Sequence, residues 1–215
     1  NYVDIQHPSD MGNWLLDGFV VTGGQFYDSV YDEDGEGKTG AGIRSEDAAL
    51  TLNNMVVSNN EISVGLVYTV NYVMGAGISH RQKSGTAGPF TMTNSWILDN
   101  KINHFRANRN YGAGASLEGS QLTMNQVVVM GNEMPDNTNL GGGLSIATPG
   151  VFIGQNMLFA KNLAAYGSAF HAREGKIVLN QVTVADNEAN VRAAISLADV
   201  NIPLHVYNSI FHRNQ

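Results

Sequence analysis

Basic side chains gather in one short part of this sequence, although the chain as a whole is acidic. Five of the twelve Lys and Arg residues fall within residues 81–109, where Asp99 is the one acid, while the formal net charge of the chain is −7. Guanidinium groups pair with carboxylate or sulfate through two parallel hydrogen bonds, and aromatic rings stack on sugar rings. The cluster predicts a site for an anionic polysaccharide, the alternative being a charged loop in water. The candidate binding residues are Arg44, Arg81, Lys83, Lys101, His104, Arg106, Arg109 and Tyr111.

A second set of residues could carry acid–base chemistry. His171, Arg173 and Glu118 combine a base, a cation and a carboxylate. Together they would suit proton abstraction next to the carboxylate of a uronic acid, with the arginine neutralising that carboxylate. The alternative interpretation, which we favour, is that these three residues have no catalytic role.

Metal sites have weaker support in the sequence. Asp32, Asp34 and Glu36 could supply oxygen ligands for calcium, but the regular EF-hand spacing is missing, so a solvated acidic loop is the alternative. His80, His104 and His171 match no zinc spacing, and we interpret them as surface histidines. The absence of cysteine excludes thiolate ligands and disulfides.

The elements that must position these residues come from an internal repeat. An eleven-residue pattern starts with alternating apolar residues, has a small polar residue in the middle and, in every copy but the first, ends in Asn. A glycine-rich signature such as Gly141-Gly142-Gly143-Leu144 precedes most copies. The seven copies are Trp14–Gly24, Leu50–Asn60, Phe90–Asn100, Leu122–Asn132, Phe152–Asn162, Ile177–Asn187 and Leu204–Asn214.

This period indicates a solenoid, and the local pattern decides which kind. Pairs such as Leu50 and Leu52 alternate at two residues, the period of a strand, and no segment has the spacing of an amphipathic helix. The sequence therefore predicts an all-β, right-handed parallel β-helix of about seven coils. Each coil would have three short strands, one after the glycine signature and two within the eleven-residue pattern.

Positions within the strands predict what faces inward. After each glycine signature an apolar residue should point into the core, and its neighbour should point outward into a groove. The outward residues are Arg44, Ser79, Ser116, Ser145, His171 and Ser196. The terminal Asn column has a structural interpretation, since Asn tolerates left-handed backbone and its amide can bond to the coils above and below.

Two apolar features predict a covered surface. One is an outward row in the second half of each pattern, formed by Val20, Val56, Trp96, Val128, Leu158, Thr183 and Ile210. The other is residues 61–74, which include Ile62, Leu66, Tyr68 and Tyr72 and should bury against a neighbouring coil or another subunit. Such surfaces usually contact a partner protein or another part of the same chain.

Composition limits the remaining choices. With 43% hydrophobic residues, the chain of 215 residues can form one domain, residues 1–215. The negative charge disfavours a nucleic-acid partner, and no apolar run reaches the ~18 residues that would span a membrane. Because neither end carries a polar cap for a solenoid, we expect a fragment of a longer chain.

The segment Trp14–Gly24, the Gly-Gly-Gly-Leu signature and the Asn-ended strands together resemble secreted right-handed parallel β-helix proteins of the pectin-lyase-like superfamily. The style is also similar to large surface proteins of Bacteroidetes-type bacteria and to chlamydial polymorphic outer-membrane proteins. The resemblance implies a secreted or bacterial cell-surface location. It leaves the activity open, because the superfamily includes polysaccharide lyases, glycoside hydrolases and adhesins.

We therefore expect a non-catalytic scaffold or adhesin that holds an anionic polysaccharide. A polysaccharide lyase or hydrolase acting in the groove beside the glycine-signature strand is the first alternative. A structural spacer in a larger surface assembly, joined through the apolar row and residues 61–74, is the second. No cofactor is expected apart from calcium at the acidic loop.

Overall fold

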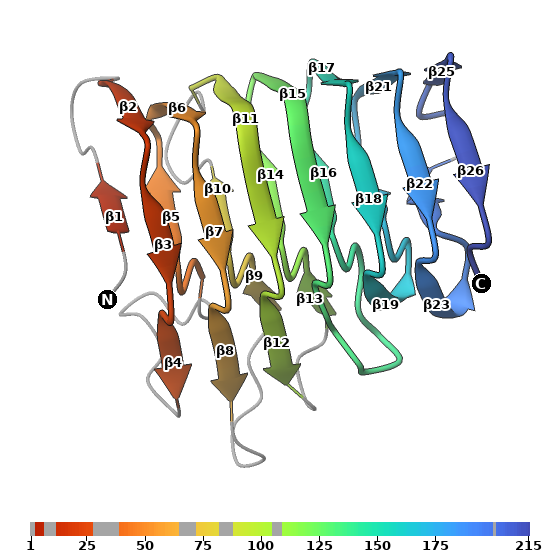
Figure 1. The fold of residues 1–215 in the computed structure, drawn as a ribbon, viewed down its shortest axis with the longest axis horizontal. Coiled ribbons are helices and arrows are strands. Elements are labelled where there is room, and N and C mark those ends of the chain that lie inside the picture. Colours follow the sequence, from red (N-terminus) through yellow and green to blue (C-terminus); the bar gives the residue numbers. More distant parts are fainter. Residues whose placement is uncertain are drawn as a thin grey trace.

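The computed structural model describes residues 3–6, 12–27, 39–64, 72–81, 88–104, 109–199 and 201–215. Within these ranges the chain forms 26 strands and no helix, so it holds no helix that could cross a membrane. The strand pairs all run parallel, and strands of successive repeats lie side by side from one end of the molecule to the other (Figure 1). The protein is therefore an all-β protein made of parallel sheets.

Sheet A contains the strand that follows each glycine signature. Its order is β1 (Val3–Gln6), β5 (Ile43–Glu46), β10 (Ile78–Arg81), β14 (Ala115–Glu118), β16 (Leu144–Ala147), β20 (Phe170–Ala172) and β24 (Ile195–Leu197). The register pairs Ile78 with Ile43 and with Ala115, and it pairs Leu144 with Phe170. The same position in each repeat thus forms one straight row, as the repeat predicts.

Sheet B contains the eleven-residue pattern. Its first half runs through β2 (Asn13–Asp17), β6 (Ala49–Asn53), β11 (Phe90–Leu98), β15 (Gln121–Met130), β17 (Val151–Gln155), β21 (Lys176–Asn180) and β25 (Leu204–Tyr207). Its second half adds β3 (Val20–Thr22), β7 (Val56–Ser58), β18 (Leu158–Ala160), β22 (Thr183–Ala185) and β26 (Ile210–His212). In β11 and β15 the two halves form one unbroken strand.

A further strand follows the terminal Asn, and the prediction of three strands per repeat missed it. Sheet C, as we name this set, contains β4 (Gln25–Tyr27), β8 (Glu61–Val64), β12 (Lys101–His104), β19 (Leu163–Tyr166) and β23 (Glu188–Arg192). Single parallel bridges from Lys101 to Glu133 and from Glu133 to Leu163 connect its two parts. A short pair, β9 (Tyr72–Met74) and β13 (Arg109–Tyr111), precedes the glycine signatures.

These strands also change the interpretation of residues 61–74. Residues 61–64 and 72–74 belong to the parallel ladders, and the side chains of Ile62 and Val73 are fully buried. The apolar character of these two ends therefore reflects strands that contact neighbouring repeats of the same chain. Leu66 and Tyr68 lie outside the described residues.

The core lies between the sheets and consists of rows of apolar side chains. Fully buried side chains include Phe90, Phe152, Phe159 and Phe170, which occupy inward positions of sheets A and B. Burying an aromatic or large aliphatic side chain stabilises a fold by about 1.5–3 kcal/mol. Because strands of successive repeats pair in parallel and in register, the arrangement is compatible with a β-helix or solenoid-like fold.

The terminal Asn residues form a ladder between sheets B and C. The Nδ2 of Asn60 donates to the Oδ1 of Asn100 at 2.9 Å, and Asn100 donates to Asn132 at 3.0 Å. Asn162 and Asn187 continue the ladder at 2.9 Å, and every backbone N–H in it also donates to the next Oδ1. The residue before each Asn has a positive φ, as in Asn59, Asp99 and Lys161, which produces the sharp corner.

Candidate functional site

The outer face of sheet A holds the row that was expected to line a groove. Arg44, Ser79, Ser116, Ser145, His171 and Ser196 are in register on six neighbouring strands. They alternate with the core positions, as predicted, but the expectation that they face solvent is wrong for most of them. Ser79, Ser116 and Ser145 are buried, and His171 is 4% exposed. The three serine hydroxyls have no hydrogen-bond partner within the described part of the chain.

At the N-terminal end of this face, two arginines share one carboxylate. Arg44 donates to Glu46 Oε1 from Nη2 at 2.7 Å, and Arg81 Nε lies 2.9 Å from the same oxygen. The side chains of Arg81 and Glu46 are almost fully buried. One carboxylate offsets only one of the two guanidinium charges, but burial and the contact with Glu46 keep Arg81 away from a ligand.

Further along the same face, the structure brings three predicted site residues together. Arg173, from the turn after β20, forms an ion pair with Glu118 at the end of β14. Its guanidinium carbon also lies 4.6 Å from the centre of the Tyr111 ring, a cation–π geometry. Arg173 therefore spans β16 and contacts residues two repeats away.

This contact bears on the acid–base chemistry considered for His171, Arg173 and Glu118. His171 lies on β20 two residues before Arg173, so the three residues do belong to one face. However, a guanidinium paired with Glu118 has little charge left to stabilise a developing enolate. The arrangement is better suited to connecting repeats than to catalysis.

An open hollow of about 440 Å³ lies at the C-terminal end of this face. We call it the corner hollow. Its lining residues are Asn137, Thr138, Leu140, Tyr166, His171, Arg192, Ser196, Leu197 and Ala198. Leu140, Tyr166 and Arg192 are in register with one another at the end of sheet C, while His171 and Ser196 are neighbours on sheet A.

A glycine corner explains how Tyr166 and His171 reach the same hollow. Gly167 has a φ of +60°, and a Cβ at this position would lie 2.4 Å from the carbonyl oxygen of Phe170. The chain therefore turns sharply between β19 and β20, and side chains five residues apart converge. The backbone N–H of Gly167 donates to the Arg192 carbonyl at 3.3 Å, which fixes the neighbouring repeat beside it.

The sequence reasoning missed Tyr166, Arg192 and Asn137 as site residues. A signal was present, because Tyr111 and Tyr166 each stand directly before the glycine of a signature, and Arg192 replaces that glycine in a weaker signature, Arg192-Ala193-Ala194-Ile195. Searching these two positions of each repeat for aromatic and basic residues would have found Tyr166 and Arg192.

His80 corrects a second expectation, since it lies in the interior and not on the surface. Its side chain is fully buried between Ser45 and Leu117, its inward neighbours on sheet A. Its ring nitrogens lie 3.3 Å from Ser45 Oγ and 3.3 Å from the Gly88 carbonyl. Burial is the main cause that lowers the pKa of His80 to about 4.

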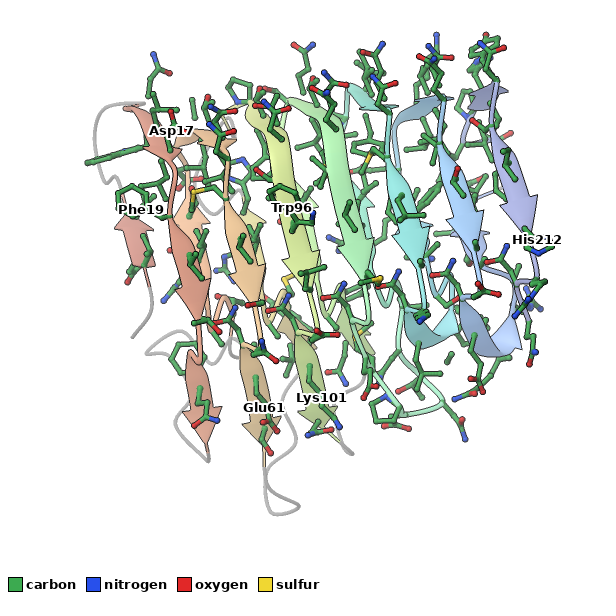
Figure 2. The ribbon with its side chains drawn as sticks, in the orientation of Figure 1. Asp17, Phe19, Glu61, Trp96, Lys101 and His212 are labelled. Atoms are coloured by element: carbon green, nitrogen blue, oxygen red, sulfur yellow. The ribbon has the colours of Figure 1, made fainter. Side chains whose placement is uncertain are left out.

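The other predicted site residues are spread over different parts of the molecule. Lys101 is on sheet C, where its Nζ lies 3.4 Å from Glu133, and Figure 2 places it beside Glu61 on the neighbouring strand. His104 and Arg109 end β12 and begin β13. The residues that fall outside the described ranges are Lys83, Arg106, Asp32, Asp34 and Glu36. Among the residues that can be described, no three His, Asp or Glu side chains group around a metal position.

The outward apolar row forms as predicted on the second half of sheet B. Val20, Val56, Trp96, Val128, Leu158, Thr183 and Ile210 are in register across seven strands. We call them the apolar row. Trp96, which points away from the sheet in Figure 2, is 44% exposed, and Ile210 is 61% exposed. The inward partners Val57, Ile97 and Phe159 are fully buried.

Comparisons with known proteins identify no relative of this chain. No protein-family model, no curated protein and no solved structure matches it. The resemblance to pectin-lyase-like proteins therefore remains a prediction from the repeat.

Proposed function

We propose that this chain is a right-handed parallel β-helix of about seven coils that acts as a non-catalytic binding module of an exported or cell-surface protein. The parallel pairing, the straight register and the Asn ladder all support this architecture. Its ligand is a polysaccharide that binds at the C-terminal end of sheet A, where the corner hollow opens.

The corner hollow is the observation that carries this proposal. It opens on the face that holds the predicted groove and combines an aromatic ring, a cation and several hydrogen-bonding side chains. Sites for small ligands commonly have volumes of about 300–1,000 Å³ and a few convergent polar groups. The two ion-paired clusters, Arg44–Glu46–Arg81 and Glu118–Arg173, then act as structural supports of the same face.

Calorimetric titration with a panel of acidic and neutral polysaccharides tests the proposal. We expect saturable binding of at least one polymer without chain cleavage. The lyase alternative predicts a rise in ultraviolet absorbance from unsaturated products, with or without calcium, and loss of that rise in His171→Ala. Turnover of this kind, or no binding to any polymer, would refute the proposed function.

The exposure of the apolar row supports a second candidate, a spacer in a larger surface assembly. A partner protein that covers the apolar row would explain why Trp96 and Ile210 are exposed in the chain by itself. Trp96→Glu should then abolish an association detectable by sedimentation. Thr51→Glu, which adds the same charge at an exposed position of β6 in the first half of sheet B, should leave it unchanged. A wild-type chain that sediments as a monomer at all concentrations and with candidate partners would dismiss this role.

A further inference from the structure

We infer that the corner hollow is a subsite for one acidic sugar unit, in which Arg192 holds the carboxylate and Tyr166 packs against the ring. This inference rests on the proposed function, because it names the kind of polysaccharide unit that the same face selects. It goes further by assigning the selectivity to residues that the sequence did not single out.

Arg192 differs from the other arginines whose side chains are described. Four of them pair with a carboxylate of the chain, namely Arg44 and Arg81 with Glu46, Arg173 with Glu118 and Arg213 with Asp186. Arg192 forms no ion pair within the described part of the chain, and it lines the corner hollow. A protein with a formal net charge of −7 has many acids that could pair with it. The guanidinium is thus left with its full charge beside an open space.

The neighbours of Arg192 fit a sugar better than a plain anion. Tyr166 is its register partner on β19, so the two residues are neighbours on adjacent strands, which lie roughly 4.8 Å apart. Tyr166 is half-buried, which leaves part of its ring to face a ligand. Ser196, Asn137 and Thr138 also line the hollow. Hydroxyl and amide groups around an aromatic ring match the alternating hydroxyls and C–H faces of a pyranose.

The charge of the site favours a carboxylate over a phosphate. Arg192 is the one arginine in the lining, and no lysine accompanies it there. A planar guanidinium meets a planar carboxylate through two parallel hydrogen bonds, and a single positive charge balances a single negative one. A dianionic phosphate would remain uncompensated in an acidic protein. The geometry therefore points to a uronic acid unit.

Matched oligosaccharides test this assignment directly. Oligomannuronate and oligomannose of the same β-1,4 linkage differ in whether carbon 6 carries a carboxylate, so titrating both against the whole chain isolates the contribution of that group. We expect Arg192→Gln to weaken oligomannuronate binding about tenfold or more, as for a lost charge-assisted hydrogen bond, and to leave oligomannose binding unchanged. Arg192→Lys keeps the charge but loses the paired hydrogen bonds, and should fall between Gln and wild type.

Lys176→Gln is the control, because it removes one exposed cation from β21 outside the hollow. It should bind both oligomers like the wild type, and equal melting temperatures should show that all variants are folded. If Arg192→Gln binds oligomannuronate as tightly as wild type, the subsite is wrong while the proposed function stands. If Lys176→Gln weakens oligomannuronate binding equally, the loss reflects the net charge of the protein, and this result would also overturn the assignment. If neither oligomer nor any other polysaccharide binds, the proposed function fails first.

Discussion

At the scale of single residues, asparagine has different structural roles in different rows. Asn132 in the ladder is fully buried, and its amide makes three donor contacts and two acceptor contacts across three repeats. Asn125, on the outer face of sheet B, accepts one exposed hydrogen bond from Asn156 at 2.8 Å. Burial decides how much the hydrogen bonds of an amide contribute to stability, because an unsatisfied buried polar group loses its water without gaining a partner.

Asn132→Ala should therefore lower the free energy of unfolding by about 4 kcal/mol, since it leaves several buried partners unsatisfied. These partners include the backbone N–H of Asn100 and the carbonyl of Ile97. Asn125→Ala, the control, should lower it by less than about 1 kcal/mol. Chemical denaturation measures both values. Similar losses for the two variants would contradict a structural role of the ladder.

His80 predicts a pH dependence whose sign follows from its buried, neutral state. Its pKa falls from 6.5 to about 4 on folding, so the unfolded chain binds the proton more readily between these values. The stability that depends on neutral His80 is fully present above pH ~6.5 and is lost as the pH falls toward about 4. The loss in the free energy of unfolding amounts to about 3 kcal/mol.

Replacing His80 by Phe removes this titration, so the stability difference between pH 7 and pH 4.5 should shrink relative to wild type. Thermal or denaturant unfolding at the two pH values measures it. Because the carboxylates of the chain are the same in both proteins, their contribution cancels in the comparison. An unchanged pH difference would show that His80 is not the titrating group.

At the scale of the elements, glycine corners set where each sheet begins. Gly112, Gly141 and Gly167 stand in the same signature position and have φ values of +58°, +77° and +60°. In each case a Cβ would meet a backbone carbonyl of the next strand within about 2.0–2.4 Å. The corner thus requires glycine for two reasons, the left-handed backbone and the close approach of the chain.

Substitutions at two glycines distinguish the effect of the left-handed backbone from the effect of the close approach. Gly112→Ala should cost about 3 kcal/mol or more, because the new methyl group would lie 2.0 Å from the Ala115 carbonyl oxygen. Gly18→Ala shares the positive φ, +77°, but has no atom within 4 Å of the new Cβ. It should cost about 1 kcal/mol, the strain of the backbone alone. Denaturation midpoints compare the two, and equal losses would rule out the steric explanation.

At the scale of the whole molecule, stability should vary along the chain. Phe211 occupies the same inward row as Ile97 and Phe159, yet it is 49% exposed while they are buried. In a stack of repeats each layer contacts only its neighbours, so layers covered on both sides open last.

Amide hydrogen exchange should show this gradient. We expect β24, β25 and β26 to exchange at least about tenfold faster than β11 and β15, which have covered neighbours on both sides. Mass spectrometry of peptides from these strands provides the measurement. Uniform protection from β11 to β26 would instead indicate a single cooperative unit.

The sequence predicted the parts of the molecule that depend on local period. The two-residue alternation of Leu50 and Leu52 determined the strand type, and repetition gave the register of the apolar row. It missed sheet C, because strands such as Glu61–Val64 have only four residues, too few for their alternation of polar and apolar residues to distinguish them from a loop. Single-chain patterns also could not show which charges meet, as in Arg173 with Glu118, because that contact skips a repeat.

The Asn ladder gives the molecule an electrical direction. Each amide from Asn60 to Asn187 donates its N–H toward the C-terminal neighbour, so the side-chain dipoles align head to tail along the axis of repetition. Hydrogen bonds in such a series polarise one another, by about 10–30% for each bond. An amide in the middle of the series is polarised from both sides, whereas Asn214 receives a bond from one side and donates to the carbonyl of Val184. The column is therefore one series of aligned dipoles, in which a central gap should weaken the hydrogen bonds of the adjacent repeats most.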